Sequence, residues 1–117
     1  MTLKERRVGD VTILHLTGRL VLDDGHDELR HKIDELADQE RVSLIVDLKD
    51  VTYIDSCGVG LLIAKYVSLR RKRGDVKLLN LTARSHHLME ISKLLDVFET
   101  FESEDHALAS FTREAQA

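Results

Sequence analysis

The segment Val42–Leu48, which reads VSLIVDL, limits the possible folds more than any other part of the chain. It is an almost uninterrupted run of β-branched residues and leucine, which is typical of a strand that is covered on both faces. Such a strand lies inside a sheet rather than at its edge. We therefore expect a central strand here, in an α/β fold.

Two strands and a helix are expected before this segment. Leu3–Val8 and Val11–Thr17 have the composition of strands, and the Gly-Asp pair between them puts glycine first, as a type II′ hairpin turn prefers. Asp23 and Asp24 then precede an amphipathic helical pattern. Its apolar face would consist of Leu29, Ile33, Leu36 and Ala37.

A second helix is expected to begin near Ser56 and to end in the basic run Arg70–Arg73, with Gly74 as a left-handed stop. Two strands would follow, one over Val76–Leu81 and an edge strand over Val97–Phe101. The helix between them would be capped by Thr82 or Ser85 and would carry Leu88, Ile91 and Leu95. A last helix, capped by Ser103, would bury Ala107, Leu108 and Phe111.

The resulting order is β-β-α-β-α-β-α-β-α, which predicts one mixed, partly parallel β-sheet with helices packed on it. With 117 residues, of which 43% are hydrophobic, the chain can build one core. We expect a single domain over residues 1–117, with its core at about 8–111.

Charge and cysteine content exclude several classes of protein. The net charge of −4, with acids and bases interspersed, argues against direct binding of nucleic acid and favours a protein or small-ligand partner. The single cysteine excludes an intrachain disulfide. The first residues lack the apolar stretch of a signal peptide, and no window approaches a membrane span, so we expect a cytoplasmic protein with no membrane partner.

The turn Asp55-Ser56-Cys57-Gly58-Val59-Gly60 is the candidate chemical site, because it puts a carboxylate, a hydroxyl and a thiol where a helix begins. Ser56 has two interpretations. It could be a simple helix N-cap. Alternatively it is a phosphorylatable hydroxyl whose phosphate is held by the N–H groups of the helix start, while Asp55 repels that phosphate or orients a kinase.

Other site types fit less well. A hydrolase elbow needs glycine where Ile54 stands, and a dinucleotide loop needs a third glycine after Gly58 and Gly60. Cys57 could be a reactive thiolate with His86 or His87 as its base, but a small packed thiol is the preferred interpretation. The six histidines are scattered without zinc-site spacing, so we expect surface residues, no metal site and no cofactor.

Several motifs resemble the STAS domain of the anti-sigma-factor antagonist family over roughly Val11–Phe111. They are Gly18-Arg19-Leu20, Asp47-Leu48, Val51-Thr52-Tyr53-Ile54-Asp55-Ser56 and Leu94-Leu95-Asp96-Val97-Phe98. The family motif is Asp-Ser-Ser/Thr-Gly-Leu-Gly/Ala, and its first serine is the phosphorylated one. It maps onto Ser56, with Asp55 as the adjoining acid. The chain departs from the family pattern at Cys57, which replaces the second hydroxyl, and at Val21, which replaces a frequent acid.

The resemblance implies partner switching that regulates transcription. Unmodified Ser56 would let the domain bind an anti-sigma factor that is also a serine kinase, and phosphorylation would release it, with a serine phosphatase as a further partner. The domain would catalyse nothing itself and would be a monomer or a weak homodimer. The residues expected to bind the partner are Asp23, Asp24, Asp55, Ser56, Cys57, Gly58 and Val59.

Two alternatives remain open. The first is a non-switching STAS subunit of a lipid transporter or of a larger signalling assembly. The second is an enzyme that uses Cys57, which would predict fast, pH-dependent alkylation of that thiol. The antagonist ranks first, the assembly subunit second and the enzyme third.

Overall fold

The strand β3, Ser43–Ile54, lies in the middle of a five-stranded sheet whose order is β1-β2-β3-β4-β5. β1 pairs antiparallel with β2, and the other three pairings are parallel. The computed structural model describes residues 1–83, 87, 90 and 97–116. The other elements are β1 Thr2–Val8, β2 Val11–Leu20, α1 His26–Asp38, α2 Ser56–Arg71, β4 Asp75–Leu79, β5 Thr100–Phe101 and α4 Glu104–Gln116. The central strand and the mixed α/β sheet are confirmed.

The opening hairpin is also confirmed. Val8 pairs with Val11, and Gly9 between them has a φ of +59°, while Asp10 has no positive φ. A positive φ at the first turn residue alone is the type II′ pattern, and glycine adopts it without a steric penalty. The β1–β2 ribbon therefore closes with the turn that its sequence favours.

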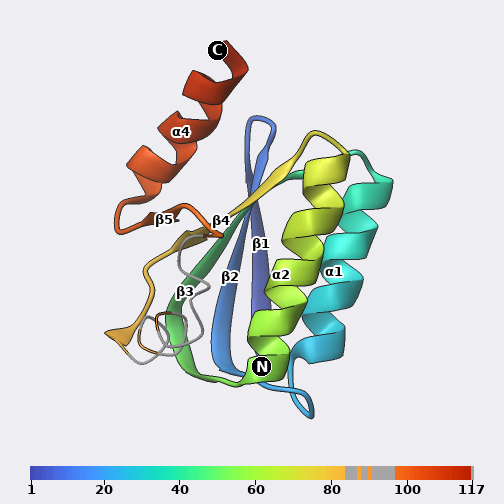
Figure 1. Cartoon of the computed structure of the whole chain (residues 1–117), viewed down its shortest axis with the longest axis vertical. Coiled ribbons are helices and arrows are strands. Elements are labelled where there is room, and N and C mark those ends of the chain that lie inside the picture. Colours follow the sequence, from blue (N-terminus) through green and yellow to red (C-terminus); the bar gives the residue numbers. More distant parts are fainter. Residues whose placement is uncertain (84–86, 88–89, 91–96, 117) are drawn as a thin grey trace.

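The helices α1 and α2 run side by side along one face of the sheet (Figure 1). The buried apolar residues of α1 are Leu29, Ile33 and Leu36, as expected from the helical spacing. They pack against Leu14 and Leu16 of β2 and against alternate residues of β3, which are Leu44, Val46 and Leu48. The largest apolar cluster of the domain therefore lies between the sheet and these two helices.

The opposite face of the sheet is partly covered by α4, which lies beside β5 and apart from α1 and α2 (Figure 1). Val11, Ile13, Ile45 and Leu79 form a smaller apolar cluster there with Ala107 of α4. Lys77 of β4 is fully buried in the same layer. Its ammonium donates a hydrogen bond to Ser110 Oγ at 2.6 Å and lies 4.2 Å from the centre of the Phe111 ring.

The end of α2 differs from the expected glycine stop. The left-handed residue is Arg73, with a φ of +65°, and not Gly74. Gly74 is required for another reason, since a Cβ at this position would lie 2.1 Å from the carbonyl oxygen of Val42. Close approach of the chain to the start of β3 therefore explains this glycine.

The C-terminal part contains a second difference. An edge strand was expected over Val97–Phe101, but β5 contains only Thr100 and Phe101, and Phe98 is buried in the main core. The expected cap of α4 is confirmed, because Ser103 Oγ accepts a hydrogen bond from the His106 N–H at 3.3 Å. The expected helix that carries Leu88, Ile91 and Leu95 lies largely outside the described residues.

The two residues at the end of α2 give opposite predictions. Arg73→Gly should raise the free energy of unfolding by about 1 kcal/mol, because glycine adopts positive φ without strain. Gly74→Ala should lower it by about 1–3 kcal/mol, because the new methyl group overlaps the Val42 carbonyl. Urea unfolding of both variants measures these changes. A neutral Gly74→Ala would contradict the assigned contact.

Candidate functional site

The first turn of α2 is positioned by the ends of two parallel strands. Leu20 at the end of β2 pairs with Ile54 at the end of β3, and only Asp55 separates Ile54 from α2. The Asp55 N–H donates to the carbonyl oxygen of Leu20 at 3.3 Å. The carboxyl ends of the strands therefore present the helix start at one edge of the sheet.

Asp55, and not Ser56, is the N-cap of α2. Its backbone is extended, and its Oδ1 accepts a hydrogen bond from the Gly58 N–H at 2.8 Å. Its Oδ2 accepts a longer hydrogen bond, at 3.3 Å, from the Leu22 N–H in the loop between β2 and α1. One carboxylate thus caps the helix and holds the neighbouring loop against it. The interpretation of Ser56 as an N-cap is wrong.

Gly58 lets the helix approach β2. A Cβ on this residue would lie 2.5 Å from the Leu20 carbonyl oxygen and 2.9 Å from Cγ1 of Ile54. Real Cβ atoms essentially never come this close to a backbone atom. The glycine is therefore needed by the packing of the turn itself, whatever binds outside it.

The residues expected to bind a partner divide into an exposed and a buried group. Ser56 and Cys57 are exposed, which contradicts the interpretation of Cys57 as a packed thiol. Gly58 and Val59, which were expected in the same contact surface, are buried. The reason is helical geometry, because successive residues rotate by about 100° around the axis and positions 58 and 59 turn towards the sheet.

Two further exposed residues adjoin Ser56. Leu22 has 59% of its surface exposed, although it is a large apolar residue. Gly60 is exposed four residues after Ser56, a spacing that puts the two residues on one helix face. We define the switch surface as Leu22, Ser56, Cys57 and Gly60. Neither Leu22 nor Gly60 has a chemical group that identifies it from sequence.

The two expected acids of the adjoining loop are also exposed. Asp23 and Asp24 follow Leu22, and the Asp24 backbone exchanges two hydrogen bonds with Val21 at 2.9 and 3.0 Å. The Asp24 Oδ1 also accepts a hydrogen bond from the N-terminal ammonium of Met1 at 2.7 Å. Asp23 and Asp24 thus belong to the loop whose Leu22 N–H bonds to Asp55, the residue before Ser56.

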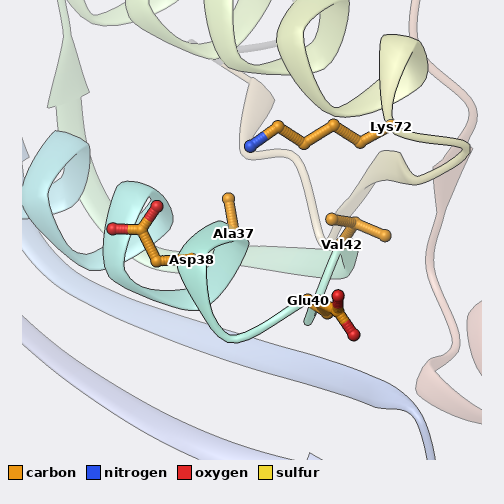
Figure 2. A pocket seen from close by; sticks show the side chains of 5 residues that line it. All are labelled: Ala37, Asp38, Glu40, Val42 and Lys72. Carbon is orange, nitrogen blue, oxygen red and sulfur yellow. The ribbon is translucent and has the colours of Figure 1, made fainter.

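The opposite end of α2 contains a pocket of about 510 Å³ between the ends of α1 and α2. Figure 2 shows the Lys72 side chain extended across this pocket, with Asp38 and Glu40 on the α1 side. The 16-residue helix α2 is about 24 Å long, so the pocket is remote from Ser56.

The described residues, 1–83, 87, 90 and 97–116, contain neither a cluster of metal-ligating side chains nor a membrane-spanning helix. Within those ranges, no group of three or more histidine, cysteine or acidic residues could hold a metal ion. No helix in the same part of the chain combines the length and the apolar character needed to span a bilayer.

The capping assignment predicts unequal effects of two neighbouring substitutions. Asp55→Ala should lower the free energy of unfolding by about 1–2 kcal/mol, because it removes the cap and the link to Leu22. Ser56→Ala should change it by less than about 0.5 kcal/mol, because Ser56 is an exposed first-turn residue. Thermal or urea unfolding measures both. Equal losses would contradict the assignment of Asp55 as the cap.

Comparison with known proteins gives related sequences and folds. The anti-sigma-B factor antagonist of Bacillus subtilis is 37% identical over 71 residues, which cover 61% of this chain and 64% of that protein. The match thus spans less than two thirds of that relative's length.

An anti-sigma factor antagonist from Mycobacterium paratuberculosis has a similar structure, with a TM-score of 0.82 and 19% identity over 93% of this chain and 92% of that one. The Bacillus cell fate determinant SpoIIAA in its phosphorylated form gives a TM-score of 0.75 and 21% identity, over 94% and 99% of the two chains. At these identities the structural likeness shows the fold.

The family itself is shown by the sequence. The model of the STAS domain matches residues 3–107, which include all of the sheet except the first residue of β1, the Asp55-capped start of α2 and the first turn of α4. The chain belongs to the STAS domain family.

Proposed function

We propose that this domain is an anti-sigma factor antagonist that works by partner switching in the cytoplasm. With Ser56 unmodified it binds an anti-sigma factor serine kinase. Phosphorylation of Ser56 releases that kinase, and a serine phosphatase restores the binding form. The observation that carries the proposal is the exposed Ser56 hydroxyl at the first residue of α2, beside the Asp55 carboxylate.

The names of related proteins support this role. The Bacillus subtilis relative is named an anti-sigma-B factor antagonist. SpoIIAA, which shares the fold, is known in an unphosphorylated and a phosphorylated form. The proposed role requires no catalysis by this chain, since the kinase and the phosphatase supply both reactions.

The rigidity of the turn supports phosphorylation of Ser56. Asp55 fixes the helix start through Gly58 on one side and the loop through Leu22 on the other. The exposed residue Ser56 therefore follows a backbone that is held on both sides. A kinase can reach the hydroxyl of such a residue without unfolding the helix.

Charge explains how the modification would act. A phosphate at Ser56 adds a charge of about −1.5 to −2 next to the Asp55 carboxylate, at the centre of the switch surface. Burying this charge against a partner costs desolvation energy and brings like charges together. A penalty of about 3 kcal/mol reduces affinity by about two orders of magnitude. The buried core lies on the other side of α2, so the fold would persist.

An exposed leucine adds the apolar part of the surface. Leu22 is 59% exposed, and its own N–H is bonded to Asp55. The apolar and the phosphorylatable parts are therefore held in one fixed arrangement. In our proposal Leu22 enters an apolar site of the kinase, where large apolar side chains contribute most of their binding energy when they are fully desolvated.

Substitution of Ser56 tests the switch. After incubation with ATP and the serine kinase, wild type should carry phosphate at Ser56, and Ser56→Ala should carry none but still bind the kinase. Ser56→Asp should bind at least about tenfold more weakly, because it introduces a negative charge at the switch surface. Mass spectrometry locates the phosphate, and calorimetry measures kinase binding.

Val67→Asp is a matched control for the added charge. Val67 is also exposed on α2, but it lies about 16 Å further along the helix axis than Ser56. The Val67→Asp substitution should therefore leave kinase binding nearly unchanged. If Ser56→Asp binds as tightly as wild type, the proposed electrostatic switch is wrong.

Gly60 is the second test of the same surface. Glycine inside a helix costs about 0.5–1 kcal/mol relative to alanine, and a Cβ at Gly60 would meet no atom within 4 Å. The fold therefore does not require this glycine, and we attribute it to close approach of the partner's chain. This differs from Gly58, which the Leu20 carbonyl explains.

Gly60→Ala should therefore have opposite effects on stability and binding. The free energy of unfolding should rise by about 0.5–1 kcal/mol, while kinase binding should weaken because the methyl group separates the two surfaces. Urea unfolding and calorimetry measure the two quantities. Unchanged binding by the stabilised variant would remove Gly60 from the contact surface.

The alternative role as a non-switching STAS subunit remains distinguishable. A subunit that only holds an assembly together needs no phosphate at Ser56. Two observations together would favour that role. Ser56 would stay unphosphorylated with every serine kinase encoded beside the gene, and the neighbouring genes would encode transporter components.

A further inference from the structure

His15 of β2 lies between two carboxylates of β3. Its Nδ1 is 2.9 Å from Asp47 Oδ2, and its Nε2 is 2.8 Å from Asp50 Oδ2. Both distances are those of hydrogen bonds, and a carboxylate can only accept. Both ring nitrogens can donate at once only in the protonated imidazolium. The expectation that the histidines are surface residues holds only in part for His15, whose side chain is 31% exposed.

These two contacts span an irregularity in the sheet. His15 pairs with Asp47 in the parallel register, but Thr17 pairs with Asp50, so β3 contains one residue more than β2 over this interval. A further shift occurs between Gly18 and Arg19. Extra residues of this kind bend a strand and interrupt its ladder of hydrogen bonds. His15 therefore links the residue before the first irregularity with the residue after it.

We infer that His15 is a proton-controlled clamp that holds the irregular part of β3 against β2 and thereby supports the strand ends that carry Asp55 and Ser56. Beyond the clamp, β2 ends at Leu20 and β3 at Ile54, and both strand ends contact the turn before α2. Asp50 lies four residues before Ile54, or about 13 Å along the strand.

The surrounding charges determine how the clamp responds to pH. Among the described residues, Lys4 of β1 pairs directly with His15. Arg6, two residues further along β1 and on the same face, forms an ion pair with Glu104 of α4. The hydrogen bonds that the His15 ring donates to Asp47 and Asp50 raise the pKa of His15 above its ordinary value of 6.5, against the opposing effect of burial. The two carboxylates outweigh the single exposed cation of Lys4.

The two carboxylates are not equivalent when the ring loses its proton. Asp47 is 13% exposed, and its Oδ1 also accepts from the Lys49 N–H at 3.1 Å and from Asn80 Nδ2 at 3.2 Å. Asp50 is 51% exposed and can turn to water. A neutral imidazole retains one N–H, so we expect it to keep the Asp47 contact and to release Asp50. The clamp then opens on the side nearest to Ser56.

The direction of the effect follows from the raised pKa. The stabilising contribution of the charged ring is fully present below pH 6.5, the ordinary value, and is lost as pH rises through the higher pKa of the folded protein. His15→Gln removes the titrating group but keeps one donor and one acceptor. The unfolding equilibrium constant of His15→Gln, divided by that of wild type at the same pH, should therefore be largest at pH 5.5 and should fall towards pH 9.

The experiment combines unfolding with NMR on the unphosphorylated protein alone, so its result does not depend on a kinase. Urea unfolding of wild type, His15→Gln and the exposed control His31→Gln is measured from pH 5.5 to 9. Ring resonances of His15 are titrated in wild type and in Asp50→Asn, where the pKa should fall. Amide resonances of Leu20–Leu22 and Asp55–Ser56 should follow the His15 titration in wild type and should not do so in His15→Gln.

Two outcomes would overturn the inference. One is a ratio of unfolding constants between His15→Gln and wild type that stays constant over the whole pH range. The other is a His15 titration that leaves the amides of Leu20–Leu22 and Asp55–Ser56 unmoved, because the clamp would then not reach the strand ends. Neither result bears on whether Ser56 is phosphorylated, so the clamp and the proposed switch fail independently.

Discussion

The bidentate role of the Asp55 carboxylate is the interaction on which the exposed end of this domain depends. One oxygen caps α2 through the Gly58 N–H, and the other holds the loop through the Leu22 N–H. Without this link the helix start and the loop would be separate surface features. With it, a change at Ser56 occurs within a fixed arrangement of an apolar side chain, a hydroxyl and a carboxylate. The Asp55 carboxylate that caps α2 is thus also the negative charge that, in our proposal, a phosphate on Ser56 would lie beside.

Features set by local patterns could be predicted from the sequence, and features set by register could not. The apolar run of β3, the hairpin turn at Gly9 and the buried face of α1 follow from side-chain periodicity and turn chemistry. The contact of His15 with Asp47 and Asp50 joins residues 32 and 35 positions apart and depends on an irregular strand pairing. No local pattern encodes such a pairing.

The site shows the same division on a smaller scale. The sequence correctly placed a helix start at Ser56, because a buried strand and an apolar helix flank the turn. It could not decide which of Asp55 and Ser56 is the cap, since both residue types are preferred there. Nor could it predict that Cys57 is exposed, because the burial of a first-turn residue depends on which way the helix is rotated over the sheet.

The buried ammonium of Lys77 has a consequence for the order in which the domain is completed. Its hydrogen-bond acceptor Ser110 and the ring of Phe111 both come from α4, more than thirty residues further along the chain. During synthesis, a chain that ends before α4 already contains Glu99, whose Oε2 lies 3.5 Å from the Lys77 ammonium, but it lacks the Ser110 acceptor and the Phe111 ring. Among the described residues, the apolar layer between the sheet and α1 and α2 contains none from α4, so the chain can bury that layer before it can bury Lys77.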